Sequence, residues 1–187
     1  MFWPSEAIDL RASVFVLALR LDPQLPRPQA RAQLRAALRE ALAARLALPL
    51  ESIDIKSTPG QPPRLEGPGL RGLIDLVGLS FSHEAGLSLA AVNLQGPVGI
   101  DLVRDETPPD WQAVARDYLG PQVHAHLLAQ DGAGFAQAWA AHEAWLKLRG
   151  QGLREWQVEF DQGLPLATTQ ALALPRPWVA CVALPPA

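Results

Sequence analysis

The chain has 187 residues, of which 49% are hydrophobic and 19% are charged, so it can bury a sizeable core and is not a disordered tail. This length fits one ordinary domain or two small ones in a single chain. The net charge of −3 lacks the basic excess of a protein whose main task is nucleic-acid binding. The single cysteine, Cys181, excludes an intramolecular disulfide bond and a cysteine-based zinc site.

The hydropathy along the chain argues against a membrane protein. No uninterrupted run of about 18 apolar residues occurs, so no membrane-spanning helix is expected. The N-terminal segment carries Glu6, Asp9 and Arg11 and lacks the basic start and apolar stretch of a secretory signal. We therefore expect a cytoplasmic protein that has no membrane partner and no nucleic-acid partner.

The first forty residues predict a strand followed by a long helix. Residues 13–21 are rich in β-branched, aromatic and aliphatic side chains, which favours a buried strand. Residues 29–48 carry apolar side chains at steps of three and four, which is typical of an amphipathic helix. Pro28 suits the first turn of this helix, and Pro49 follows its end.

Arginines recur every four residues along the predicted helix. They are Arg27, Arg31, Arg35 and Arg39, and this spacing puts them on one helix face. The simplest interpretation is a solvated face, which is the usual fate of a run of charges. The alternative is an anion-binding stripe.

The rest of the first half predicts a loop and two strands. Residues 58–72 are rich in proline and glycine and predict an irregular loop. Short strands are expected at residues 75–81 and 87–93, joined by a turn over residues 82–86. A second turn at residues 95–97 is the best candidate for a boundary between two halves.

The second half of the chain repeats this order of elements. A strand is expected at residues 98–103, and glycines at 150 and 152 stop the last of the helices that follow. Because each half would place a long helix over a few strands, element order suggests a pseudo-duplication. The remaining predicted elements are helices at 111–119, 122–129 and 135–149 and strands at 156–160 and 179–184.

Three groups of residues carry possible chemistry, and each also has an ordinary structural interpretation. Asp101 ends the sequence Gly-Ile-Asp on a predicted buried strand, but it could be an acid satisfied by a turn. Glu143 and Lys147 lie one helical turn apart and could be a common surface pair. Ser82 and His83 lie in the predicted turn, where the histidine could simply bond to the backbone.

The order of these motifs along the chain is more specific than any one of them. It resembles the 4'-phosphopantetheinyl transferases, and in particular the larger pseudo-dimeric class that activates peptide and polyketide synthases. The matching elements are Val98-Gly99-Ile100-Asp101, the run Trp139-x-x-x-Glu143-Ala-x-x-Lys147-x-x-Gly150-x-Gly152-Leu153, the upstream Phe81-Ser82-His83, Gly60-Gln61-Pro62, and Arg31 on the long helix.

The resemblance implies a fold and an activity. The fold would be α+β with two pseudo-symmetric halves, each a long helix on a small, mainly antiparallel sheet, and the active site between them. Residues 1–96 would contact the phosphates and adenine of coenzyme A, and residues 97–187 would carry magnesium and the catalytic groups. Such an enzyme transfers 4'-phosphopantetheine from coenzyme A to a serine of an apo acyl or peptidyl carrier protein and releases adenosine 3',5'-bisphosphate. With both halves in one chain, a monomer is expected.

The resemblance also implies residue roles. Asp101 and Glu143 would hold Mg²⁺, which prefers carboxylate and phosphate oxygens. Glu143 could also take the proton of the carrier serine, and Lys147 would reach the phosphates as a point charge. The implied coenzyme A contacts are Arg27, Arg31, Gln61, Ser82, His83, His142 and Lys147.

The chain departs from the family pattern at three of these positions. Val103 stands where many relatives have a second acid, so water would complete the metal shell. His142 stands where lysine is usual, and Gln61 replaces another lysine. These losses of charge predict weaker coenzyme A binding, and they leave open a second possibility, a non-catalytic relative that binds coenzyme A or a carrier protein without transfer.

A carrier protein that is acidic around its serine needs positive charge on the enzyme. Because this chain is acidic as a whole, any positive docking surface must be local. The candidates are Arg104, Arg116 and the arginine stripe of the first helix.

Overall fold

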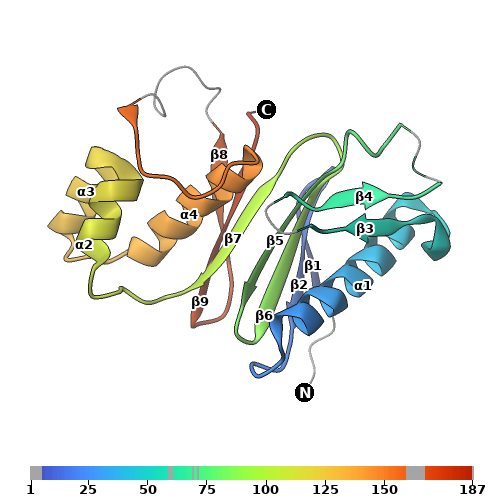
Figure 1. The fold of residues 1–187 in the computed structure, drawn as a ribbon, viewed down its shortest axis with the longest axis horizontal. Coiled ribbons are helices and arrows are strands. Elements are labelled where there is room, and N and C mark those ends of the chain that lie inside the picture. Colours follow the sequence, from blue (N-terminus) through green and yellow to red (C-terminus); the bar gives the residue numbers. More distant parts are fainter. Residues whose placement is uncertain (1–5, 59–60, 69, 71, 159–166, 187) are drawn as a thin grey trace.

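Two β-sheets lie face to face, and a long helix covers the outer face of each sheet (Figure 1). The structure is a computed structural model and describes residues 6–58, 61–68, 70, 72–158 and 167–186. Helices and antiparallel sheets are both prominent, so the predicted α+β class is confirmed. No helix in the described ranges is long and apolar enough to cross a membrane.

The first half forms a four-stranded antiparallel sheet in the order β1-β2-β6-β5. Its outer face packs against α1 through buried Leu34, Leu38 and Leu42, which recur at the helical spacing that the sequence predicts. A small hairpin of β3 and β4 borders the same core. The bounds are β1 Glu6–Arg11, β2 Val14–Arg20, α1 Arg27–Leu46, the short helix η1 Leu50–Ser52, β3 Asp54–Lys56, β4 Arg64–Glu66, β5 Gly78–Glu84 and β6 Leu87–Asn93.

The second half forms a three-stranded antiparallel sheet in the order β7-β9-β8, and α4 covers its outer face. Between β7 and α4 the chain makes α2, one π-helical turn and α3, which pack around Trp111, Leu119 and Phe135. The bounds are β7 Gly99–Arg104, α2 Trp111–Val114, the π turn Ala115–Leu119, α3 Gly120–Ala129, α4 Phe135–Leu148, β8 Thr168–Leu172 and β9 Trp178–Leu184.

Strand alternation gives the molecule four layers, α1, first sheet, second sheet and α4. In β2, Phe15 faces α1, whereas Val14 and Val16 face the second sheet. In β7, Ile100 and Leu102 face the first sheet and are buried in the core that the two sheets share. Among the described residues, every strand of the first sheet precedes residue 97 and every strand of the second follows it.

One predicted strand and one predicted loop of the first half differ from the structure. The strand expected at 75–81 lies at Gly78–Glu84, so Ser82 and His83 belong to the strand, and the turn is confined to Ala85 and Gly86. Pairing of Glu84 with Leu87 extends the ladder to this tight turn, in which Gly86 has a φ of +87°. The prediction of an irregular loop over 58–72 is also wrong at β4, which pairs with β3.

The strand expected at 156–160 is wrong where the structure describes it. Residues 156–158 form no strand, and 159–160 lie outside the described residues. The Trp156 amide instead donates to the Asp117 carbonyl at 2.7 Å, which ties this segment to the π turn. The third strand of the second sheet is β8, whose residues are mostly exposed and therefore carry a weak hydrophobic signal.

Candidate functional site

The candidate site lies where the edge strands of the two sheets meet. β5 ends the first sheet and β7 ends the second, and the two strands lie side by side (Figure 1). Because Ile100 and Leu102 point into the core between the sheets, Asp101 points to the opposite side, toward α4. The α4 helix comes so close to Gly99 that a Cβ there would lie 1.8 Å from the Ala144 carbonyl oxygen. This close approach holds Asp101 against the helix turns that carry Glu143 and Lys147.

Lys147 joins α4 to both edge strands. Its Nζ lies 2.6 Å from Asp101 Oδ1, and the Asp101 side chain is only 9% exposed. The same ammonium donates to the Ile100 carbonyl at 3.0 Å and to the Phe81 carbonyl at 3.4 Å. Loss of Lys147 would leave the buried Asp101 carboxylate without its partner, which would lower the free energy of unfolding.

Glu143 lies one turn before Lys147 and is half-buried. Burial raises the pKa of its carboxyl group, the nearby Asp101 carboxylate raises it further, and Lys147 opposes the shift. The effect of Asp101 shows that the two carboxyl groups are close enough to repel each other. The structure thus brings together Asp101, Glu143 and Lys147, which the sequence placed on a strand and a helix about forty residues apart.

Ser82 contacts Asp101 directly. Its hydroxyl donates to Asp101 Oδ1 at 2.9 Å and accepts the Leu102 amide at 3.1 Å. The residue is 6% exposed. The family resemblance implies a contact between Ser82 and coenzyme A phosphates, and the structure shows its hydroxyl engaged on the strand that carries Asp101.

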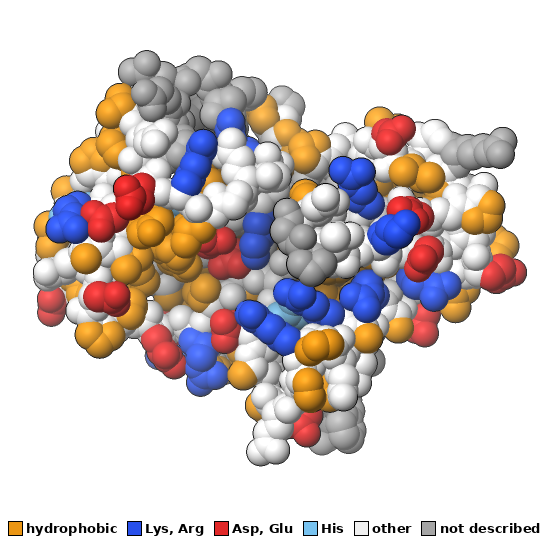
Figure 2. Space-filling view, in the orientation of Figure 1, with side chains coloured by type: hydrophobic (Ala, Val, Ile, Leu, Met, Phe, Trp, Pro, Cys, Tyr) orange, Lys and Arg blue, Asp and Glu red, His pale blue; other side chains and the backbone are white. Residues whose placement is uncertain are grey.

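His83 faces the arginines of α1. Its Nδ1 lies 2.8 Å from Ser88 Oγ, and its Nε2 is buried with no hydrogen-bond partner among the described residues. Burial lowers its pKa, and together with the charges of Arg31 and Arg27 and, less strongly, of Lys147 and Arg35, it brings the pKa to about 4. The imidazole is therefore neutral at pH 7 within a positive field. Figure 2 shows several Lys and Arg side chains gathered near the middle of this face of the molecule.

A cavity of about 340 Å³ is lined by His83, Glu143 and Lys147 among these groups. Arginine and histidine from the first half and the α4 groups from the second half line it, so it spans both halves. The loop before β4 and the segment after α4 contribute its remaining walls. The predicted site residues that line it are Arg31, Gln61, His83, Glu143 and Lys147.

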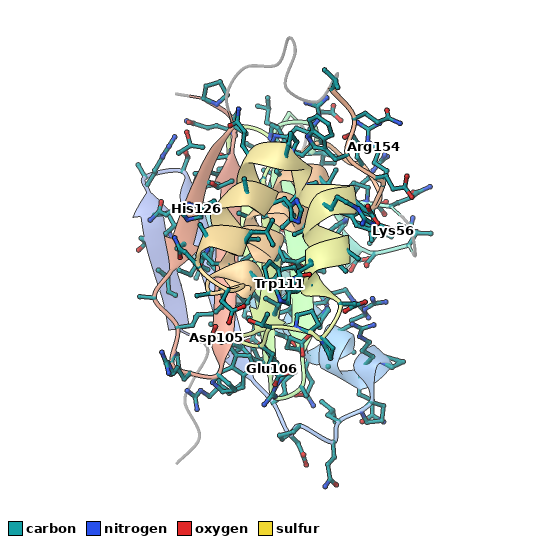
Figure 3. The ribbon with its side chains drawn as sticks, turned by 90° about the vertical axis from the view of Figure 1, so that its left-hand side faces the viewer. Lys56, Asp105, Glu106, Trp111, His126 and Arg154 are labelled. Carbon is teal, nitrogen blue, oxygen red and sulfur yellow. The ribbon has the colours of Figure 1, made fainter. Side chains whose placement is uncertain are left out.

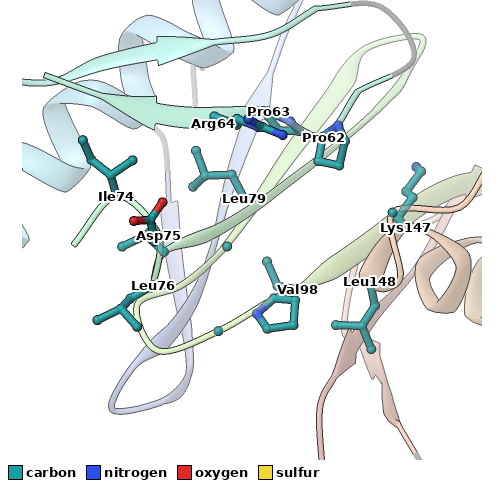
Figure 4. A pocket seen from close by; sticks show the side chains of 15 residues that line it. Pro62, Pro63, Arg64, Ile74, Asp75, Leu76, Leu79, Val98, Lys147 and Leu148 are labelled. Atoms are coloured by element: carbon teal, nitrogen blue, oxygen red, sulfur yellow. The ribbon is translucent and has the colours of Figure 1, made fainter. Parts of the chain in front are cut away.

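Two further cavities adjoin this one. A groove of about 470 Å³ shares Pro62, Pro63 and Lys147 with it, and Figure 4 shows Ile74 and Leu76 on one side of that groove and Lys147 on the other. A smaller cavity of about 230 Å³ lies on the far side of His83 and is lined by Arg27. Arg27 therefore reaches His83 from a different cavity than Arg31 does.

His142 lies apart from these three cavities. Its ring lies between Trp139 and Trp145, with centroids 6.1 and 6.3 Å away, and its Nε2 is buried without a partner among the described residues. Burial lowers its pKa. The structure therefore separates His142 from the other residues that the family resemblance assigns to coenzyme A.

The described residues contain no group of three or more His, Cys, Asp or Glu side chains placed to hold a metal ion. Asp101 and Glu143 are two carboxylates within electrostatic range of each other, and Val103, on the same face of β7 as Asp101, packs in the apolar cluster beneath α4. A Mg²⁺ ion commonly takes one or two protein carboxylates and completes its shell with water and substrate phosphates. The residues present fit that kind of site, because they supply two carboxylates beside a cavity lined by cations.

Sequence reasoning missed the partners that hold Lys147 and Asp101 in place. The Phe81 and Ile100 carbonyls leave no side-chain signal. The alternation of Ser80 and Ser82 on a strand was a visible signal, since it places both hydroxyls on the face toward β7.

Comparison with protein families gives an independent assignment for the second half. Residues 97–180 match the family model described as the 4'-phosphopantetheinyl transferase superfamily. The matched region runs from the linker before β7 into β9 and includes Asp101, Glu143 and Lys147. No curated protein matches the chain.

Proposed function

We propose that the protein transfers the 4'-phosphopantetheine group of coenzyme A to a serine of an apo acyl or peptidyl carrier protein. The observation that carries this proposal is a cavity lined by Glu143 and Lys147 from the second half and by Arg31 and His83 from the first, with Asp101 bound to the same Lys147. The match of residues 97–180 to a superfamily of phosphopantetheine transferases supports the same reaction class. The larger, pseudo-dimeric class is part of the proposal, as is a division into halves at residues 96 and 97.

The cations of the cavity suit the phosphates of coenzyme A. Arg31 and Lys147 line its wall. Arg27 and Arg35 add positive charge, which contributes to the lowered pKa of His83. A neutral His83 is able to accept or donate one hydrogen bond without adding a fixed charge. Gln61 lies at the wall formed by the loop before β4, where its backbone would meet the adenine.

The acids suit the reacting end of the same ligand. Asp101 and Glu143 would hold Mg²⁺, whose bound charge would neutralise the pyrophosphate. The hydroxyl oxygen of the carrier serine attacks the β-phosphorus, and the bond to the bridging oxygen breaks, so that adenosine 3',5'-bisphosphate leaves. The serine proton passes to the Glu143 carboxylate, which is half-buried and lines the cavity where the serine would enter.

Lys147 contributes charge at the point where the phosphates and Asp101 meet. Its ammonium lies on Asp101 Oδ1 at 2.6 Å and also lines the cavity, so a small rotation of a flexible side chain would bring it onto a phosphate oxygen. This position suits stabilisation of the charge that builds up on the departing phosphate.

The carrier would dock beside this site, on the surface next to α2 and α3. Figure 3 shows Asp105 and Glu106 near one end of that surface and Trp111 above them. Arg104 pairs with Glu106 at 2.9 Å and Arg116 with Asp117 at 2.7 Å, so both candidate docking arginines have acidic neighbours. An acidic carrier would compete with these exposed acids for the arginines, at an energy that salt would screen.

The proposal is tested by incubating the protein with coenzyme A, Mg²⁺ and an apo carrier protein and weighing the carrier by mass spectrometry. A gain of one phosphopantetheine supports transfer, and the Glu143→Gln variant is the matched control that retains the size of the side chain. Binding of coenzyme A or the carrier without any mass gain would instead support the non-catalytic alternative. Sedimentation of the active species would test the expected monomer.

A further inference from the structure

We propose that Ser82 is a positioning residue that orients the Asp101 carboxylate, an inference that rests on the proposed function. The two strands that meet at the site, β5 and β7, belong to different sheets and form no ladder with each other. Two serine hydroxyls of β5 accept hydrogen bonds from β7 amides, which backbone carbonyl groups would accept in a regular ladder. Ser80 Oγ accepts the Ile100 amide and Ser82 Oγ accepts the Leu102 amide, each at 3.1 Å.

These two hydrogen bonds satisfy the free edge of β7. An edge strand presents alternate amides outward, and such amides are costly to bury without a partner. Ser80 and Ser82 are 4% and 6% exposed, so water does not replace them easily. The two serines therefore make equivalent contributions to the joint between the halves.

Ser82 differs from Ser80 in its contacts with Asp101 and with Lys147, whose Nζ lies 3.5 Å from Ser82 Oγ. Because the Ser82 oxygen accepts the Leu102 amide, its own proton is free to point elsewhere, and it points to Asp101 Oδ1 at 2.9 Å. Lys147 Nζ reaches the same oxygen at 2.6 Å. Both the Ser82 hydroxyl and the Lys147 ammonium bond to Oδ1, and neither bonds to Oδ2 in the described part of the structure. Asp101 Oδ2 is therefore the oxygen that remains available to a cation.

The serine therefore acts on the cation through Asp101. A hydroxyl fixed by a strand amide holds the carboxylate in one rotamer, so the carboxylate does not have to be ordered when the ion arrives. Lys147 does not hold that rotamer alone once a ligand binds, because it also lines the cavity and a bound phosphate would compete with Asp101 for its ammonium. Ser82 keeps Asp101 in place when Lys147 leaves it.

The test compares Ser82→Ala with Ser80→Ala. Both variants lose the buried hydrogen bond to a β7 amide, and Ser82→Ala also loses the bond to Asp101, so both should lower the free energy of unfolding and Ser82→Ala should lower it more. Loss of a residue that orients a metal ligand typically costs 10–100-fold in metal affinity, so Ser82→Ala should weaken Mn²⁺ binding by about tenfold or more. Ser80→Ala should bind Mn²⁺ within about twofold of wild type. Electron paramagnetic resonance of Mn²⁺ titrated into each full-length protein measures these affinities.

Kinetics supply a second measurement. In the transfer assay Ser82→Ala should need more Mg²⁺ for half-maximal rate, should recover much of its rate at saturating Mg²⁺, and should keep its KM for coenzyme A. Equal Mn²⁺ affinity in the two variants, with an active wild type, would overturn the positioning role and leave the proposed function intact. A wild type that neither binds Mn²⁺ nor transfers phosphopantetheine would overturn the proposed function and this inference together.

Discussion

His83 should make the stability of the protein depend on pH in a way that a single variant removes. Its folded pKa is about 4, against an ordinary value of 6.5, because it is buried and faces Arg31 and Arg27. The unfolded chain therefore binds more protons than the folded chain between these two values. Stability contributed by neutral His83 is complete above about pH 6.5 and is lost as pH falls toward 4.

The size of the effect follows from the difference between the two pKa values. One unit corresponds to about 1.4 kcal/mol, so the full difference between 6.5 and about 4 is worth at most about 3.5 kcal/mol. By pH 5, where the unfolded histidine is almost fully charged and the folded one is not, about 2 kcal/mol of this should already be lost. For a domain of this size that is a substantial part of the whole stability.

The assay is urea unfolding of wild type and His83→Asn at pH 7.5 and pH 5. Asparagine does not titrate, and its amide retains a polar atom for Ser88, to which His83 bonds at 2.8 Å. Because all other ionisable groups are shared, the change in the difference between the two proteins isolates His83. Wild type should lose about 2 kcal/mol more than the variant over this interval. An equal loss in both proteins would refute the burial of a neutral imidazole among the arginines.

Two further predictions concern the site and its frame. Asp101→Ala and Glu143→Gln should each reduce phosphopantetheine transfer at least a hundredfold, because these two carboxylates are the ligands that the site would offer a cation. The circular dichroism spectrum of each variant should stay native. Near-normal turnover in either variant at saturating Mg²⁺ would contradict the assignment of that residue. Gly99→Ala should destabilise the protein by about 3 kcal/mol or more in urea unfolding, because its Cβ would lie 1.8 Å from the Ala144 carbonyl oxygen. Gly152→Ala is the control, since nothing lies within 4 Å of its Cβ, and equal stability of the two variants would show that α4 does not pack on β7 as closely as observed.

How far the sequence predicts this molecule depends on the range of the interactions that shape each part. The α1 and α4 helices follow from local periodicity, and the spacing of four between Glu143 and Lys147 correctly puts both on one face of α4. By contrast, β8 has mostly exposed residues and exists because β9 offers it an edge, so no local pattern could reveal it.

The site shows the same division. Asp101 could be recognised as a buried strand acid, but its bond to Lys147 crosses 46 positions and depends on the contact between β7 and α4. The predicted turn at Ser82 was wrong because the ladder to β6 runs three residues further than hydrophobicity indicated. The position of His142 between Trp139 and Trp145, by contrast, follows from local spacing, because the three residues lie three apart on α4.

The arginine field around His83 leads to a last prediction, on proton uptake during ligand binding. In the free protein Arg31, Arg27, Lys147 and Arg35 all disfavour the imidazolium form. Phosphates bound in this cavity would offset those charges and offer the buried Nε2 an acceptor, so the pKa of His83 should rise in the complex.

A higher pKa in the complex means that binding takes up a proton between the two values, and that affinity increases as pH falls through that window. Calorimetry of adenosine 3',5'-bisphosphate binding at pH 5.5, repeated in buffers with different ionisation enthalpies, measures the number of protons taken up. On binding, wild type should take up a substantial fraction of one proton. His83→Asn lacks the titrating group and should not take up this fraction. Equal uptake in the two proteins would mean that the phosphates do not reach His83, and it would place the anion site along Arg31 and Lys147 alone. Because both of those residues line the cavity that Glu143 also lines, even that result would keep the phosphates beside the acids of the site.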